Sequence, residues 1–189
     1  MSPLVDRSMM ESVFDAGELV TLDEAALAVI PHGPTRAFLR DVGLPDEYCR
    51  WLELDEALAE GVVTLVGEAG ASELAAKYPR LTVDTSTWMT VGGIGYDNVA
   101  LDVVDGTVYC IPESGAPCIL NSGIDVFAHF LHALEVERPN YDFESDADGF
   151  TPRAEDRLRT FMEAADPVAL AHPDSAWHIV LECVERKLQ

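Results

Sequence analysis

Hydrophobic and polar positions alternate most regularly in the middle of the chain, between residues 88 and 121. Short runs rich in β-branched and aromatic residues cover 88–95, 99–104, 107–111 and 118–121, and such runs are typical of strands. Asp105-Gly106 separates two of them, and both residues tolerate the positive φ angles of a hairpin turn. Glycines 92, 93 and 95 indicate a bulge or turn. The pattern predicts an antiparallel meander of three or four strands over about 88–121.

Apolar residues recur at helical spacing on either side of this region. Residues 124, 127, 130, 131 and 134 are all apolar and predict an amphipathic helix, capped by Ser122, that lies on the sheet. Capping residues, prolines and glycines also predict helices over 23–30, 34–42, 152–166 and 176–189. Residues 46–61 are expected to be partly helical, 62–68 (VVTLVGE) to form a strand and 69–87 to be irregular. Helices at both ends and strands in the middle predict an α+β fold, with a central, mainly antiparallel sheet flanked by helices.

The length of 189 residues suits one domain. Residues 1–30 are weakly patterned and are interpreted as a lead-in segment without a placement in the fold. Residues 31–189 are expected to form a single α+β domain. No internal repeat divides them further.

Charge narrows the classes of partner. The chain has 34 Asp and Glu against 12 Lys and Arg, which gives a net charge of −22. This excess argues against nucleic acid as a partner, because phosphate contacts need clustered Lys and Arg. It also argues against an anionic membrane surface and favours a basic partner. The chain has no apolar run of membrane-spanning length and no secretory signal pattern, so a cytoplasmic protein with reduced thiols is expected. Its four cysteines form no CxxC pair and are expected to act as small hydrophobic residues.

Candidate catalytic and metal-binding patterns are weak. Asp125, His129 and His132 lie at helical spacing, but on or near the solvated flank of the predicted helix. The loop 144–155 nearly fits the calcium-binding pattern, with Glu144 in place of the usual first Asp. Its alternative is a solvated acidic loop before a helix, so calcium binding stays open. No nucleophile, zinc or phosphate-loop motif is present, so no cofactor and no metal are expected. An enzyme that uses paired carboxylates or a metal is unsupported by any motif but is not excluded.

An acidic stretch mixed with aromatic residues runs from Glu135 to Phe150. Acids attract a cationic partner and aromatic residues supply contact area, so this composition favours an interface. An equally open alternative is that the aromatic residues pin the loop to the core. The candidate partner-binding residues are Tyr141, Asp142, Phe143, Glu144, Asp146 and Asp148.

Several local motifs resemble the SUKH superfamily of immunity proteins, in particular its fourth subgroup. They are AFLRDVGLP (37–45), LVGE (65–68), GYDNVALDVVDGTVYCI (95–111), CILNSGIDVFAHFLHAL (118–134) and AWHIVLECVERKL (176–188). The family often has a second Ser after the Asn-Ser pair, where this chain has Gly123.

The resemblance implies a central sheet flanked by helices and a role without catalysis. It implies an immunity protein that binds and blocks a toxin domain of a polymorphic toxin system, mostly a nuclease or nucleic-acid deaminase. Such toxins are usually basic, and the charge of −22 suits contact with one. The alternative is an acidic DNA mimic or scaffold that binds many basic proteins. The contact face and the oligomeric state stay open.

Overall fold

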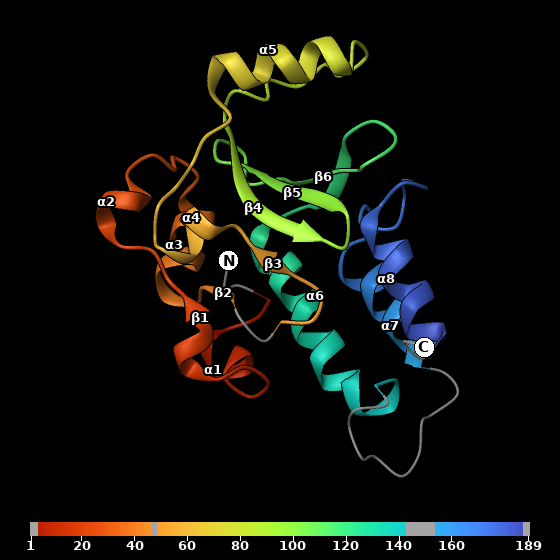
Figure 1. The fold of residues 1–189 in the computed structure, drawn as a ribbon. Coiled ribbons are helices and arrows are strands. Elements are labelled where there is room, and N and C mark those ends of the chain that lie inside the picture. Colours follow the sequence, from red (N-terminus) through yellow and green to blue (C-terminus); the bar gives the residue numbers. More distant parts are fainter. Residues whose placement is uncertain (1–3, 47–48, 143–153, 187–189) are drawn as a thin grey trace.

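The computed structural model describes residues 4–46, 49–142 and 154–186. The first part of the chain contains short elements around a small two-stranded sheet (Figure 1). They are α1 (Arg7–Met10), η1 (Ala16–Glu18), β1 (Leu19–Val20), α2 (Glu24–Leu27), α3 (Gly33–Asp41) and β2 (Leu44–Pro45). Gly43 ends α3 with a φ of 85°, as expected for a helix stop. This region shares the main core, to which it contributes Val5, Met10 and Phe14.

A five-stranded antiparallel sheet occupies the centre. Its order is β3-β4-β5-β6-β7, and its strands are β3 (Glu53–Leu54), β4 (Trp88–Ile94), β5 (Asp97–Asp102), β6 (Val108–Ile111) and β7 (Cys118–Asn121). The last four strands form the predicted meander, and a turn containing Gly106 joins β5 to β6. The prediction of an α+β fold with a mainly antiparallel sheet is confirmed.

A bulge in β4 lies at the double glycine. The β4–β5 register shifts between Thr90 and Gly92, which agrees with the bulge expected from these glycines. Gly92 has a φ of 151°, and a Cβ there would lie 2.1 Å from the Glu53 carbonyl oxygen. Only glycine allows β3 to approach β4 this closely.

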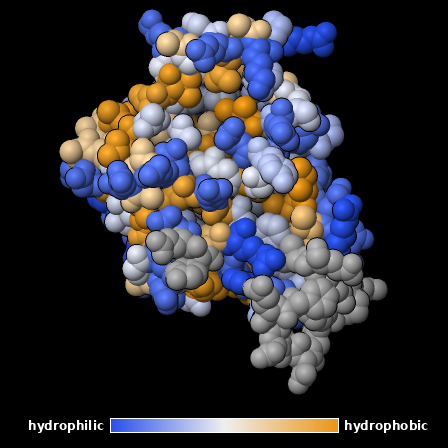
Figure 2. Space-filling view, in the orientation of Figure 1, coloured by the Kyte–Doolittle hydropathy of each residue, from blue (hydrophilic) through white to orange (hydrophobic). Residues whose placement is uncertain are grey.

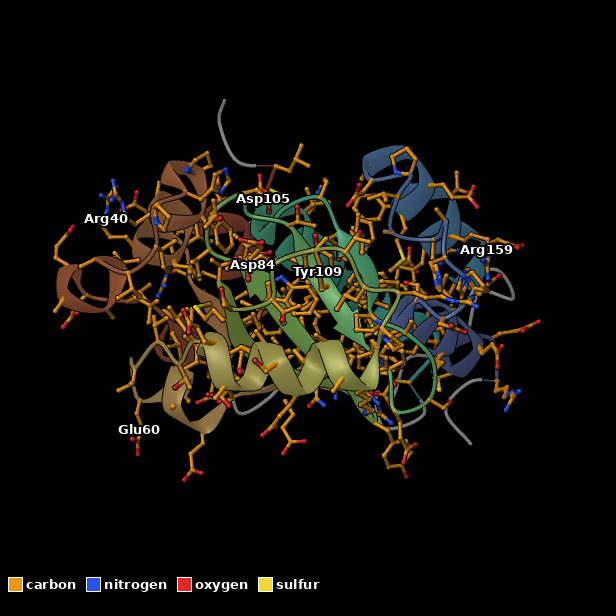
Figure 3. All side chains as sticks on the ribbon, turned by 90° about the horizontal axis from the view of Figure 1, so that it is seen from above. Arg40, Glu60, Asp84, Asp105, Tyr109 and Arg159 are labelled. Atoms are coloured by element: carbon orange, nitrogen blue, oxygen red, sulfur yellow. The ribbon has the colours of Figure 1, made fainter. Side chains whose placement is uncertain are left out.

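The two faces of the sheet pack against different helices. The remaining helical elements are α4 (Glu56–Ala59), α5 (Gly67–Lys77), α6 (Ile124–Glu137), η2 (Arg138–Asn140), α7 (Ala154–Ala165) and α8 (Ala176–Glu185). Met89, Val91 and Leu101 point into the main core, which α6 and α8 complete. Trp88 and Tyr109 point to the opposite face and stack with ring centroids 4.3 Å apart. Seen from above, α5 lies across the sheet beside Tyr109 (Figure 3).

The sequence prediction for 62–77 was wrong, whereas residues 78–87 are irregular as expected. Instead of a strand over 62–68, only Leu65 forms an isolated bridge, to Met89. Gly67, with a φ of 66°, then ends the extended segment, and α5 occupies part of the region expected to be irregular. The short strand β3 already pairs with part of the same edge of β4. The run therefore meets β4 only where the Thr64 carbonyl oxygen accepts the Thr90 N–H and the Val66 N–H donates to the Trp88 carbonyl oxygen. The alanines of α5 then favour a helix.

Candidate functional site

Tyr141 lies inside the protein, directly after η2, which follows α6. Its side chain is 1% exposed. Its hydroxyl donates a hydrogen bond to the Leu134 carbonyl oxygen at 2.9 Å and accepts one from Trp51 Nε1 at 3.0 Å. Burial raises the pKa of this hydroxyl, so it stays neutral at physiological pH. The described contacts give Tyr141 a structural role, which corresponds to the alternative in which aromatic residues pin this segment.

Asp142 is the centre of an ion-pair network. Its Oδ2 lies 2.8 Å from Arg138 Nε and 3.2 Å from Arg50 Nη1. Arg138 also pairs with Glu135, whose Oε2 is 3.2 Å from Nη1. The hydrogen bond that Arg138 donates to Asp142 raises the pKa of Arg138, and burial raises the pKa of Glu135. The Asp142 side chain is only 2% exposed. Through these two arginines its carboxylate links the end of α6 to the segment before β3.

The other candidate residues, Phe143, Glu144, Asp146 and Asp148, lie outside the described residues, as does most of the near-calcium loop 144–155. A partner contact through 141–148 therefore stays a prediction. Arg50, which donates a hydrogen bond to Asp142, also lines a neighbouring cleft. The sequence did not single out this cleft.

This cleft has a volume of about 490 Å³. Segments far apart in the sequence enclose it: residues 50–51, the β4–β5 turn, the loop 112–114 after β6, the loop 173–175, and α8. Figure 1 shows the β4–β5 turn ending close to α8. We call it the Tyr96 cleft, after the aromatic residue of that turn.

Two large hydrophobic side chains are exposed where they line the Tyr96 cleft. Tyr96 is 88% exposed and Ile179 of α8 is 56% exposed. On the face drawn in Figure 2, apolar residues form several patches among hydrophilic ones. Exposed aromatic and aliphatic groups beside a cleft are typical of binding sites. The sequence did not single out Tyr96; the signals that could have found it are its place after Gly95 and within the motif 95–111.

The charged residues lining the Tyr96 cleft are mostly acidic. They are Asp97, Glu113 and Asp174, with Arg50 as the basic residue. Asp97 is 6% exposed, and its Oδ1 accepts a hydrogen bond from the Glu113 backbone N–H at 3.0 Å. Glu113 and Asp174 are exposed. Gly115 brings the loop after β6 so near that a Cβ there would lie 2.9 Å from Asp174 Oδ2. Negative charge is therefore held on two apposed loops.

The histidines of α6 border a separate hollow between α6 and α7. His129 packs edge-on against Phe161, with ring centroids 4.8 Å apart, and His132 Nε2 lies 3.4 Å from the Ser12 hydroxyl. Burial lowers the pKa of both histidines. Within the described residues, no group of three or more His, Cys, Asp or Glu side chains is arranged to hold a metal ion.

Cys110 and Cys118 face each other on neighbouring strands. They are register partners in β6 and β7, and both are buried. Both are free thiols, as are the half-buried Cys49 and Cys183. Burial raises the pKa of Cys49 to about 11, which makes it a poor nucleophile.

The Asn121-Ser122 pair belongs to a buried hydrogen-bond network. Trp177 Nε1 donates to Asn121 Oδ1 at 3.0 Å, and Asn121 Nδ2 donates to Asp166 Oδ2 at 3.1 Å. The same carboxylate oxygen accepts the Ser122 backbone N–H at 2.8 Å. The prediction that Ser122 is the N-cap of α6 was wrong, because the N-cap is Gly123. The pair instead joins β7, α8 and the end of α7.

Comparison with family models completes this picture. The model of the SUKH-4 immunity protein family matches residues 5–183. The chain belongs to this family. Comparison with curated proteins gave no match, and comparison with solved structures gave none.

Membership of the SUKH-4 family indicates an immunity role, and the family is not enzymatic. The match starts at residue 5 and so includes most of the lead-in segment that had no placement in the sequence analysis. Among the described residues, no helix is long and apolar enough to cross a membrane.

Proposed function

We propose that this SUKH-4 protein binds a toxin domain of a polymorphic toxin system and neutralises it by protein–protein contact. The observation that carries the proposal is the family match over residues 5–183. The toxin is a basic nuclease or nucleic-acid deaminase, whose positive surface otherwise holds the anionic substrate. A protein of net charge −22 attracts such a surface over long range.

Electrostatic attraction makes capture fast. Complementary charge raises association rates toward about 10⁸–10⁹ M⁻¹s⁻¹ at low salt. An immunity protein gains from this speed, because a free nuclease damages the cell until it is bound. We therefore expect the association rate to fall steeply with added salt and the dissociation rate to change much less.

The proposal is tested by a rescue assay. A toxin domain encoded beside the gene of this protein is expressed in a sensitive host with and without the protein, and survivors are counted. Survival only in the presence of the protein, with a complex that co-purifies, supports the proposal. Death in both cultures despite good expression contradicts it for that toxin. Binding to many unrelated basic proteins with similar affinity would instead indicate an acidic DNA mimic or scaffold.

The predicted contact through the acidic stretch has its own test. Glu144, Asp146 and Asp148 are replaced together by Lys, and Asp142 is kept because its ion pairs stabilise the end of α6. The matched control reverses three exposed acids elsewhere, Glu60, Glu73 and Glu163. A larger loss of toxin affinity in the first variant supports a contact in this stretch, and equal losses contradict it.

A further inference from the structure

The turn between β4 and β5 has an exposed aromatic side chain, Tyr96, that does not pack in the core. Gly95, with a φ of 60°, lets the chain reverse between β4 and β5. Tyr96 follows it and is 88% exposed, so its ring contributes little to the core. Tyr is among the residues that dominate binding energy at interfaces, where its ring becomes buried. Ile179 on α8 extends this apolar surface across the cleft.

Negative charge surrounds the same apolar surface. Asp97, Glu113 and Asp174 line the cleft, and Arg50, the basic residue there, pairs with the buried Asp142 carboxylate. The Asp97 carboxylate is nearly buried, and the protein groups seen near it are neutral donors, the Glu113 N–H and the Cys110 thiol. A carboxylate accepts up to about four hydrogen bonds. A bound cation would find hydrogen-bond acceptors on Asp97, Glu113 and Asp174.

We propose that the Tyr96 cleft receives an Arg or Lys side chain of the toxin domain. The cationic head would lie against the Tyr96 ring and the cleft carboxylates, an arrangement that combines cation–π and ionic attraction. Its alkyl stem would lie along Ile179 and the prolines 112 and 173. An anionic group would be repelled, and a purely apolar one would strip water from the carboxylates without replacing it. This inference rests on the proposed function for the identity of the partner.

A short cationic peptide tests the cleft without the toxin. The ¹⁵N-labelled full chain is titrated with acetyl-Gly-Arg-Gly-amide and, as a control of similar length without charge, with the norleucine peptide. Shifts produced by the Arg peptide, and not by norleucine, should concentrate on residues 94–97, 112–114 and 173–175. Shifts spread evenly over all acidic surfaces, or equal shifts with both peptides, would overturn the proposal.

Variants then test the cleft against the toxin itself. Tyr96→Ala should weaken toxin binding by roughly tenfold or more, the loss typical of an interface hot spot. Glu113→Lys with Asp174→Lys should weaken it more than Glu60→Lys with Glu73→Lys, since both pairs change the net charge equally. The replaced acids are exposed, so circular dichroism and unfolding midpoints should match those of the wild type.

The outcomes separate the two proposals. Rescue that survives with unchanged toxin affinity in both the Tyr96→Ala and the Glu113/Asp174 variants overturns the cleft assignment and leaves the immunity function standing. Arg-peptide shifts at the cleft without rescue from any neighbouring toxin support a cation-binding cleft and contradict the proposed function. Equal affinity losses in the two charge-reversed pairs mean that only long-range charge matters, which overturns the cleft assignment.

Discussion

Replacing Tyr141 by Phe isolates the buried hydroxyl that joins Trp51 to α6. The substitution leaves the ring in place, with its centroid 6.1 Å from that of Trp51. It removes the acceptor for Trp51 Nε1 and the donor to the Leu134 carbonyl oxygen, at 3.0 and 2.9 Å. Each neutral hydrogen bond contributes about 1 kcal/mol, and each buried group left without a partner costs about 1–3 kcal/mol. We expect the free energy of unfolding to fall by about 2–3 kcal/mol.

The assay is urea denaturation followed by tryptophan fluorescence. The midpoint should fall while the slope stays unchanged, and the melting temperature should drop by roughly 5–10 °C. Tyr96→Phe is the matched control, because it removes a hydroxyl from a ring that is 88% exposed, and we expect a change within about 0.5 kcal/mol. A Tyr141→Phe variant as stable as this control would refute the structural role of the hydroxyl.

Three further predictions concern a buried hydrogen-bond network, the close approach of two strands, and the pH dependence of stability. Asn121→Leu should lower the free energy of unfolding by about 2–4 kcal/mol in chemical denaturation. The substitution leaves Trp177 Nε1 and one acceptor site of Asp166 buried without the hydrogen-bond partner that Asn121 supplies. Gly92→Ala should lower the melting temperature by several degrees in calorimetry, since its Cβ would collide with the Glu53 carbonyl oxygen; an unchanged value would contradict the tight β3–β4 approach. Burial lowers the pKa of His129 and His132 in the folded state, so the unfolded chain takes up protons first as the pH falls. The stability that these histidines contribute above about pH 6.5 is therefore lost as the pH falls through their folded-state pKa. The double variant His129→Gln with His132→Gln should show a weaker pH dependence of the urea midpoint between pH 7.5 and 5.5.

The meander and α6 could be predicted because their signals are local. Asp105-Gly106 sits between two runs of strand-forming residues, and the turn between β5 and β6 forms there. The apolar positions of α6 predicted its buried face, and Phe127, Phe130 and Leu134 are fully buried. Each of these predictions depended on neighbours within a few residues.

The failures depend on contacts between distant residues. Nothing near Leu65 shows that β3 pairs with the end of β4 at Gly92 and Gly93, so the run 62–68 meets β4 only around Met89 before the chain turns into α5. The buried state of Tyr141 depends on Trp51, which is 90 residues away in the sequence. The same limit hid the Tyr96 cleft, because segments from residue 50 to residue 183 enclose it.

The central claim is that this SUKH-4 protein neutralises a toxin by binding it directly. The most direct measurement is a titration of the activity of a purified toxin domain, encoded beside its gene, with the purified protein. The account predicts that toxin activity falls linearly to zero at a fixed molar ratio and that a stable complex elutes as one species. Full toxin activity in the presence of excess folded protein, from a toxin whose lethality the protein suppresses in cells, would contradict neutralisation by direct contact.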